Sequence, residues 1–359
     1  MRIGIDATPL LIRSAGVKNY LYRWIAGLRE AASADKIEAF PFLRSLGALD
    51  HEHSIAGRVP TFWRLLLLHL ANTTGAPVLE PLTSRYDVFH ASNLIRHRPR
   101  RILVTATVYD FTCRLMPQFH TAANIEADRL LDENIFAKAD GLIAISENTR
   151  ADAVRFLGIP ADRIAVIYPG VPDEFFRATP TRRAKPYILS LGTIEPRKNI
   201  DTLLDAWLAL SPSIREEYEL VVAGPVGWSS DNTMARIRGG LPGVRHLGYI
   251  PEAELPGLTA GATLLAYPSL YEGFGFPVAQ AMAAAVPIVT SNVSCLPEVA
   301  GDGALLVDPR SVEELSAALD RLLTSPSLRK ALGERGAARA QRYRWNVCAR
   351  ESLDFFHRL

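Results

Sequence analysis

The sequence predicts an α/β protein made of two domains, each built around a parallel sheet. Its 359 residues are too many for one small core, because a domain typically holds about 150 residues. Short apolar runs alternate along the chain with longer segments of helical spacing, which is the order of βαβ units. Most of these runs are apolar throughout, as expected of parallel strands that helices cover on both faces.

We place five strands in the first half of the chain and six in the second. The first five are expected at Ile3–Ala7, Val88–Ala91, Ile102–Thr107, Leu142–Ser146 and Val166–Tyr168. The other six are expected at Tyr187–Leu191, Leu220–Ala223, Val244–Leu247, Ala262–Tyr267, Ile288–Ser291 and Ala304–Val307. Helical segments of roughly ten to fifteen residues separate many of them, which predicts a parallel sheet in each half.

A polar stretch marks the expected domain boundary. Residues 175–186 read FFRATPTRRAKP and contain two prolines and four basic residues, which is typical of a linker. We therefore expect an N-terminal domain over residues 1–175 and a C-terminal domain over residues 176–344. In the tail, residues 345–359, apolar side chains recur at helical spacing, which predicts a helix packed on a domain face.

The composition is that of an ordinary globular protein and argues against several classes of protein, such as disulfide-rich and zinc-binding ones. The formal net charge is only +2, so no overall electrostatic field favours binding to nucleic acid or to a membrane. Cys113, Cys295 and Cys348 lie far apart and form no CxxC pair, which argues against a disulfide framework or a zinc site and favours a reducing compartment. The first residues, MRIGIDATPL, read as a buried strand and not as a signal peptide.

The longest apolar stretch is too short to cross a membrane. It runs over Phe62–Ala71 and is interrupted by Arg64 and His69, whereas a spanning helix needs about 20 apolar residues. We expect a cytoplasmic protein, with contact to the inner membrane surface left open.

The segment PSLYEGFGFPVAQAMAAAVPIVTSN, residues 268–292, is the most informative part of the sequence. It begins at the carboxyl end of an expected strand, where open parallel sheets bind ligands. Glu272 lies in this loop beside Gly273 and Gly275, which allow unusual backbone angles and a close approach of main-chain N–H groups. Pro277 suits the first turn of a helix, whose N–H groups attract anions. A nucleotide sugar fits this arrangement; the alternative is an ordinary strand–turn–helix with a solvated glutamate.

A second segment, YILSLGTIEPRKNIDTLLDAW, predicts a strand, a loop and a helix that starts near Asn199. Arg197 and Lys198 lie at that helix start, and two adjacent cations there can neutralise a diphosphate. Paired loop cations are often merely solvated. Their place after a strand of the same domain as Glu272 favours a functional role.

Together these segments resemble glycosyltransferase family 4. Matching text runs through nearly the whole chain in order: SAGVKNY at 14–20, ATVYDFTCRLMP at 106–117, ADGLIAISENTRAD at 139–152, AVIYPGV at 165–171, LGTIEPRKN at 191–199, HLGYIPEAEL at 246–255, YPSLYEGFGFP at 267–277 and SCLPEVAGDGALLVDP at 294–309. The resemblance implies the GT-B fold, in which two Rossmann-like domains face each other across a cleft. It also implies retaining transfer of a sugar from a nucleotide-diphosphate donor. The nearest branch is the bacterial one that builds surface polysaccharides, often from mannosyl donors.

The resemblance also implies roles for particular residues. Arg197 and Lys198 match the pyrophosphate-binding pair, and Glu272 matches the glutamate that meets donor-sugar hydroxyls. The other positions that match donor contacts are Gly16 in the N-terminal glycine loop, Gly192 in the LGTIEPRKN loop, Tyr249 and Ile250 at the nucleobase, and Gly273, Phe274 and Gly275 in the backbone cradle.

Three positions depart from the family pattern. The second glutamate of the Glu–seven residues–Glu motif is Gln280, which can still hydrogen-bond a ribose but carries no charge. The His-Asp pair of the first domain reads Tyr109-Asp110, so Tyr109 stands where the family has a sugar-facing histidine. Lys18 replaces a second glycine in the N-terminal loop. These changes leave the identity of the donor open. They also leave the alternative that the protein is a pseudoenzyme, which binds the donor without transferring its sugar.

Other candidates are weaker. His90 lies at the end of an expected strand. There it either contacts a ligand or is a hydrogen-bonded, half-buried side chain. His51 and His53 have no third ligand nearby, and no Asp-x-Asp occurs, so no metal is expected. The basic run at Arg96, His97, Arg98, Arg100 and Arg101 is either solvated or in contact with an anionic lipid headgroup or a lipid-diphosphate acceptor.

The resulting prediction is a metal-independent, retaining hexosyltransferase without a cofactor. Its donor is a nucleotide-diphosphate sugar, with GDP-mannose favoured, and its acceptor is a glycan or a polyprenyl-diphosphate-linked glycan. Nucleic acid is not expected as a partner. A nucleotide-sugar epimerase or a phosphorylase on the same fold is a further alternative.

Overall fold

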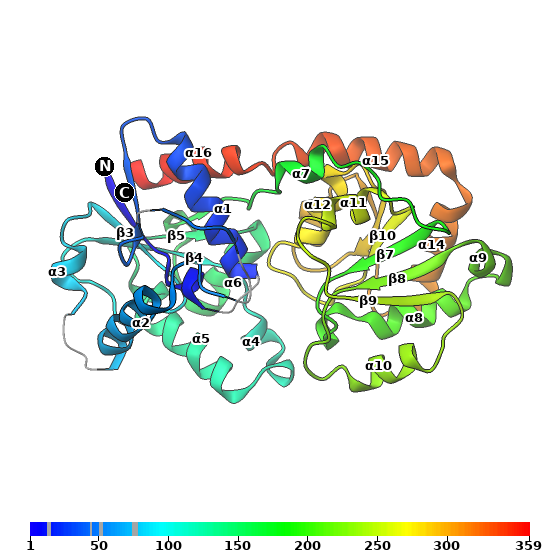
Figure 1. The fold of residues 1–359 in the computed structure, drawn as a ribbon, viewed down its shortest axis with the longest axis horizontal. Helices are drawn as coiled ribbons and strands as arrows, with labels where there is room; N and C mark the ends of the chain where they lie inside the picture. The colour runs from blue at the N-terminus through cyan, green and yellow to red at the C-terminus, as the bar shows by residue number, and fades with distance from the viewer. Residues whose placement is uncertain (13–15, 44, 50–52, 74–77) are drawn as a thin grey trace. The chain divides into compact units, whose positions relative to one another are not determined.

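The structure is a computed structural model that describes residues 1–12, 16–43, 45–49, 53–73 and 78–359. The chain divides into two compact units (Figure 1). The first comprises Met1–Gly170 with Trp345–Leu359, and the second comprises Val171–Arg344. The division lies at Gly170, ahead of the polar stretch 175–186. Among the positions raised from the sequence, His51 and the first two residues of the SAGVKNY segment, Ser14 and Ala15, lie outside the described residues.

The first unit contains a six-stranded parallel sheet in the order β2-β1-β3-β4-β5-β6. Each of the five expected strands overlaps an observed one. The strands are β1 (Arg2–Asp6), β2 (Lys36–Phe40), β3 (Val88–Ala91), β4 (Leu103–Val108), β5 (Gly141–Ala144) and β6 (Ile164–Val166).

The strand β2 was not expected from the sequence. It lies at the sheet edge and pairs with β1 alone. Its sequence, KIEAF, begins exposed and ends buried, so it lacks the continuous apolar run that reveals a strand covered on both faces.

The second unit contains a six-stranded parallel sheet in the order β12-β11-β10-β7-β8-β9, and all six expected strands are present. They are β7 (Tyr187–Leu191), β8 (Glu219–Ala223), β9 (Val244–Gly248), β10 (Leu264–Tyr267), β11 (Ile288–Ser291) and β12 (Ala304–Val307). The strand order reverses between β10 and β7, which makes this the switch point where parallel sheets bind ligands.

Helices cover both sheets, so each unit is a Rossmann-like layered domain, as predicted (Figure 1). Those of the first unit are α1 (Gly16–Ala31), α2 (Arg58–Thr73), α3 (Glu80–Thr83), α4 (Thr112–Leu115), α5 (Ala122–Asn134), α6 (Glu147–Leu157) and α16 (Trp345–His357). Those of the second unit are α7 (Asp173–Phe176), α8 (Ile200–Ala209), α9 (Pro212–Glu217), α10 (Asp231–Arg238), α11 (Leu255–Ala260), α12 (Phe276–Ala283), α13 (Leu296–Ala300), α14 (Val312–Thr324) and α15 (Pro326–Ala340).

The chain end returns to the first unit as α16, which lies along α1 (red and blue in Figure 1). The indole Nε1 of Trp24 donates a hydrogen bond of 2.9 Å to Ser352 Oγ. The Trp24 ring also packs on Phe356, with 6.1 Å between ring centroids. Both aromatic side chains are fully buried, so α16 completes one hydrophobic face of the first sheet.

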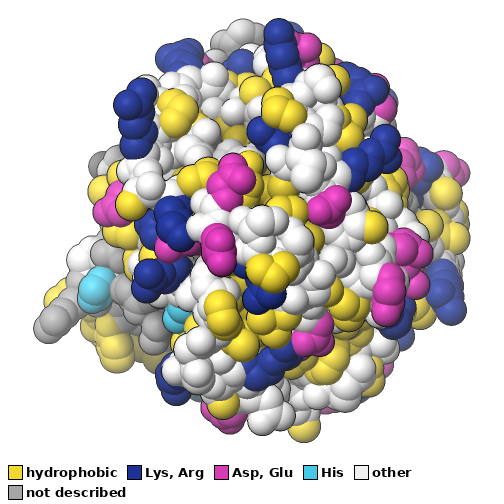
Figure 2. Space-filling model, turned by 90° about the vertical axis from the view of Figure 1, so that its right-hand side faces the viewer, with side chains coloured by type: hydrophobic (Ala, Val, Ile, Leu, Met, Phe, Trp, Pro, Cys, Tyr) yellow, Lys and Arg dark blue, Asp and Glu magenta, His cyan; other side chains and the backbone are white. Residues whose placement is uncertain are grey.

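Surface charge is mixed in sign. On the face shown in Figure 2, Lys and Arg side chains are interspersed with Asp and Glu instead of gathering by sign. No helix in the described part of the chain is long and apolar enough to cross a bilayer.

Candidate functional site

The candidate site lies at the carboxyl ends of β7 and β10, neighbours at the switch point of the second sheet. The loop after β7 carries Arg197 and Lys198 in a short 3₁₀ turn, Pro196–Lys198. The loop after β10 carries Glu272. The side chain of Asn199 joins the two loops, because its Nδ2 donates to the carbonyl of Pro268 at 3.0 Å.

Glu272 forms ion pairs with both predicted diphosphate-binding cations. Its Oε2 lies 2.8 Å from Arg197 Nη1, and its Oε1 lies 2.6 Å from Lys198 Nζ. The Glu272 side chain is 10% exposed. The structure therefore brings together the three charged residues that the sequence singled out from loops 74 positions apart.

The charges of the cluster keep Glu272 ionised. Burial alone would raise the pKa of its carboxyl, but the charges of Arg197 and Lys198, with hydrogen bonds from Lys198 and Ser269, lower that pKa to about 2. Burial lowers the pKa of Lys198, while the negative charge of Glu272 opposes that shift. The site thus holds two cations and an ionised carboxylate in a largely buried setting.

Three further residues of the cluster were not expected from the sequence. Ser269 Oγ donates to Glu272 Oε1 at 2.7 Å, and Tyr267 Oη donates to the same oxygen at 2.8 Å. Glu195 Oε1 accepts from Arg197 Nη2 at 2.6 Å. Tyr267 ends an apolar strand and reads as core, while Glu195 reads as a loop carboxylate, so only their contacts reveal them.

Two glycines of the site, Gly275 and Gly192, have backbone angles in the left-handed region. Gly275 has φ of 85° and precedes α12 directly. A Cβ there would lie 2.7 Å from Leu296 Cδ2, so the position requires glycine for both backbone angle and space. Gly192 has φ of 144° at the end of β7, and a Cβ there would lie 3.6 Å from Lys198 Cε.

The remaining predicted donor contacts of the second unit differ in exposure. Gly273 is buried, and Phe274 is 2% exposed with its ring packed on Tyr343, 5.4 Å between centroids. The ring of Phe274 is therefore part of the packed interior. Gln280 is half-buried on α12, and the loop after β9 presents an exposed Tyr249 and a half-buried Ile250.

The predicted residues of the first unit lie on other elements. Gly16 is exposed at the start of α1. Tyr109 follows β4 and is half-buried, with its ring edge on Tyr20 at 5.4 Å between centroids. Burial raises the pKa of the Tyr109 phenol, and the nearby Asp6 carboxyl raises it further, so the hydroxyl stays neutral.

Lys18 and His90 belong to the interior of the first unit. Lys18 Nζ donates to the carbonyls of Ile12 at 2.9 Å and His53 at 2.6 Å, which explains a buried lysine in place of glycine. His90 is 1% exposed, and its two ring nitrogens lie 2.9 Å from Thr105 Oγ1 and 3.0 Å from Thr107 Oγ1.

The interior position of His90 decides between its two interpretations. Burial lowers the pKa of its imidazole to about 3, so it is neutral and structural. It is more deeply buried than expected, because its ring also packs on Trp24 at 4.7 Å between centroids.

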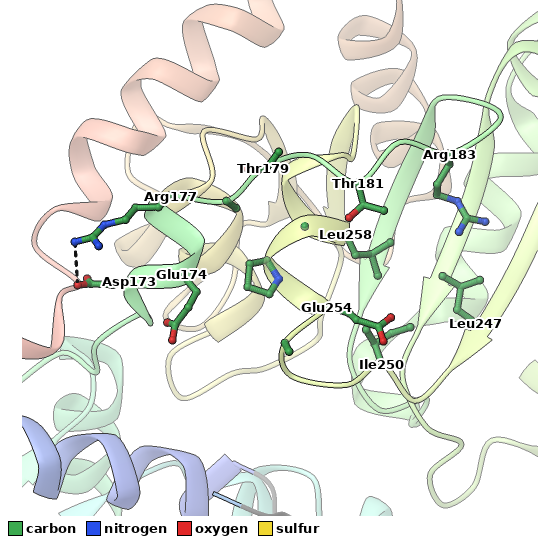
Figure 3. A pocket seen from close by; sticks show the side chains of 14 residues that line it. Asp173, Glu174, Arg177, Thr179, Thr181, Arg183, Leu247, Ile250, Glu254 and Leu258 are labelled. Atoms are coloured by element: carbon green, nitrogen blue, oxygen red, sulfur yellow. Dashed lines mark ion pairs between the residues drawn. The ribbon is translucent and has the colours of Figure 1, made fainter. Parts of the chain in front are cut away.

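A surface cavity of about 820 Å³ lies beside the predicted nucleobase loop (Figure 3). It is lined by α7, the stretch after it and α11, with Ile250 from the loop. In Figure 3, Arg177 pairs with Asp173 at its rim, 3.8 Å apart. The charged cluster at Glu272 does not line this cavity. In the described part of the chain, no three His, Cys, Asp or Glu side chains gather to hold a metal ion.

Comparisons with known proteins agree with this architecture. A family model described as Glycosyl transferases group 1 matches residues 172–339, and one described as Glycosyltransferase Family 4 matches residues 15–175. The O-antigen chain mannosyltransferase B of Escherichia coli is 33% identical over 286 residues, which cover 75% of this chain and 74% of that protein.

Solved structures show the same fold. Sucrose-phosphate synthase of Thermosynechococcus elongatus matches with a TM-score of 0.74 and 18% identity, over 100% of this chain and 98% of that chain. HepE of Anabaena, solved in complex with UDP, matches with a TM-score of 0.71 and 17% identity over 100% of both chains. The two parallel-sheet units and these relatives define a glycosyltransferase of the GT-B fold. The chain belongs to glycosyltransferase family 4.

Proposed function

We propose that the protein is a retaining hexosyltransferase that takes mannose from a nucleotide-diphosphate donor, GDP-mannose, and adds it to a glycan or a polyprenyl-diphosphate-linked glycan. The single observation that carries this proposal is the cluster of Arg197, Lys198 and Glu272 at the switch point of the second sheet. Mannose is supported by the Escherichia coli relative, which is an O-antigen chain mannosyltransferase.

The cluster suits a diphosphate and a sugar together. Arg197 can grip phosphate oxygens with its planar guanidinium, and Lys198 adds a second positive charge beside it. Both cations would stabilise the charge that develops on the departing diphosphate, which is electrostatic catalysis. Glu272, ionised at neutral pH, would then accept hydrogen bonds from sugar hydroxyls.

The residues of the cluster suit a transfer that retains the anomeric configuration and needs no metal ion or other cofactor. The cations of the cluster perform the charge neutralisation that a metal performs in Asp-x-Asp enzymes, and the sequence has no Asp-x-Asp. The sugar would pass through an oxocarbenium-like state. An acceptor hydroxyl would bond to the anomeric carbon from the face that the diphosphate leaves, and its proton would pass to the departing diphosphate. Tyr109 and Gly16 of the first unit are the proposed contacts from the other domain.

The direct test incubates the purified protein with GDP-mannose and a mannose-containing lipid-linked acceptor, with and without EDTA. We expect mannose transfer in both, and a product with the anomeric configuration of the donor by NMR. A product of inverted configuration would overturn retention, and transfer abolished by EDTA would overturn metal independence. Parallel reactions with UDP-glucose and dTDP-sugars test the choice of donor.

A donor-binding pseudoenzyme is the second candidate, favoured by Gln280 and Tyr109 in place of a glutamate and a histidine. Under that hypothesis the protein binds nucleotide diphosphate but neither transfers nor hydrolyses the donor. Gain of activity only in Gln280→Glu would support it. Turnover by the wild-type protein excludes it.

We further propose peripheral contact with the inner membrane surface from the cytoplasmic side, through α2 and the basic run that follows β3. One face of α2 exposes large apolar side chains, with Phe62 at 61% and Trp63 at 63%. The helix contains no acidic residue. Asn72 at its end accepts from the backbone N–H of Arg96 at 3.0 Å, which ties the basic run to the helix. Exposed aromatic side chains on a helix whose other end contacts the basic run suit an interface rich in anionic lipid.

Co-sedimentation with vesicles tests this contact. Wild type should bind vesicles containing phosphatidylglycerol more strongly than vesicles of phosphatidylcholine, and the double variant Phe62→Ser, Trp63→Ser should lose that binding. Trp228→Ser is the matched control, because Trp228 of the second unit is also exposed, at 51%. Equal vesicle binding by wild type and the double variant would refute the contact.

A further inference from the structure

Tyr267 holds a position in the cluster that the proposed chemistry has not used. It is the last residue of β10 and is 2% exposed. Its hydroxyl oxygen lies 2.6 Å from Lys198 Nζ and 2.8 Å from Glu272 Oε1. A purely packing tyrosine would need neither contact.

The direction of these hydrogen bonds follows from the groups involved. An ammonium only donates hydrogen bonds, so Tyr267 Oη accepts from Lys198 Nζ. The hydroxyl of Tyr267 in turn donates a hydrogen bond to the carboxylate of Glu272. The phenol stays protonated, since burial and then the charge of Glu272 raise its pKa. The hydroxyl therefore links the cation to the carboxylate while carrying no charge itself.

The two cations are held by different groups. Arg197 is fixed by Glu195 at 2.6 Å and by the carbonyl of Tyr271 at 2.9 Å, besides Glu272. Lys198 has a flexible stem and a compact charge, and its ammonium is directed by Glu272 and Tyr267. If Glu272 turns toward a sugar hydroxyl, Tyr267 is the group that keeps Lys198 aimed at the site.

We propose that Tyr267 is a positioning residue for donor binding, which acts by holding the ammonium of Lys198 against the departing diphosphate. This inference rests on the proposed function of Lys198. It makes a prediction that simple packing does not, because removing the Tyr267 hydroxyl should matter only while Lys198 is present.

A double-mutant cycle tests this dependence. Binding of GDP, and in parallel of UDP, ADP and dTDP, is measured by calorimetry for wild type, Tyr267→Phe, Lys198→Ala and the double variant. We expect Tyr267→Phe to weaken nucleotide-diphosphate binding about fivefold to tenfold in the wild-type background, which corresponds to the net contribution of one ordinary hydrogen bond. In the Lys198→Ala background it should have no further effect.

Tyr187→Phe is the matched control. Tyr187 is also a buried tyrosine of the second sheet, and its hydroxyl donates to the carbonyl of Leu258 at 2.5 Å. It begins β7, whereas Arg197 and Lys198 follow that strand's other end. Its loss should lower thermal stability without changing nucleotide affinity.

The pH dependence gives a second readout. The charged and titratable groups facing Lys198 are Glu272, Arg197, Glu195 and Tyr267. Tyr267→Phe removes an acceptor that favours the charged ammonium. The alkaline limb of nucleotide-diphosphate binding should therefore move to lower pH in Tyr267→Phe and stay in place in Tyr187→Phe.

Each outcome bears on one claim. The same loss of affinity from Tyr267→Phe with and without Lys198, or an unmoved alkaline limb, would overturn the positioning role. Unchanged affinity in Lys198→Ala, or no binding of any of the four nucleotides to wild type, would overturn the proposed function itself.

Discussion

The ion pairs of Glu272 predict a specific dependence of stability on pH. The pKa of this carboxyl is about 2 in the folded protein, against 4.5 for an unperturbed glutamate side chain. Each pKa unit corresponds to about 1.4 kcal/mol, so this difference of roughly 2.5 units represents about 3 kcal/mol of folding free energy.

The sign follows from the lowered pKa. A carboxyl whose pKa is lower when folded contributes its full stabilisation above the unfolded value, 4.5, and loses it as the pH falls through about 2. By pH 3 about 2 kcal/mol of the contribution should already be lost. The Glu272 side chain is 10% exposed, so solvent screens this pair little.

Glu272→Gln is the perturbation that isolates this contribution. The amide keeps the shape of the side chain, but it leaves Arg197 and Lys198 without their shared carboxylate. We expect a loss of about 3 kcal/mol at pH 7, shrinking by about 2 kcal/mol at pH 3.

Urea denaturation followed by circular dichroism at pH 7, 5, 4 and 3 measures the difference between wild type and variant. Asp320→Asn, which neutralises an exposed carboxyl on α14, is the control and should show a difference near zero throughout. A difference between wild type and Glu272→Gln that is the same at pH 7 and pH 3 would refute the reasoning.

Four further predictions concern residues assigned to donor binding. Alanine at Arg197 or Lys198 should weaken nucleotide-diphosphate binding by roughly 1.5–3 kcal/mol each, and unchanged affinity of the double variant in calorimetry would contradict their role. Gln280→Glu should strengthen donor binding by about 1–2 kcal/mol or change the preferred base, which a screen of thermal stabilisation by four nucleotide diphosphates would detect. Tyr109→Phe should lower kcat more than nucleotide affinity; equal turnover at saturating donor and acceptor would leave Tyr109 as a packing residue. Gly275→Ala should lower the unfolding free energy by about 1–3 kcal/mol, because φ is 85° there and Leu296 occupies the space of a Cβ; an unchanged melting temperature would contradict this strain.

Buried strands could be predicted because their signal is local. A strand covered on both faces must be apolar at successive positions, as in β7 and β8, so its sequence alone reveals it. An edge strand such as β2 carries no such run, and its pairing with β1 depends on residues that α1 separates from it in sequence.

The charged residues of the site could also be predicted, since Arg197, Lys198 and Glu272 lie in loops with glycine and proline signals at strand ends. Their mutual pairing could not. Glu195 and Tyr267 show no pattern of their own, and what distinguishes them is contact with groups from another loop.

The sequence by itself determined the two parallel-sheet domains, the family and the loops that carry the charged residues, because these depend on patterns within short segments. Only the tertiary structure decided that Glu272 holds both cations, that Lys18 is a buried structural lysine and that His90 is a neutral core residue. The physical reason is that hydrogen bonding, burial and ionisation are properties of a side chain's neighbours. Those neighbours come from strands and loops that the fold brings together.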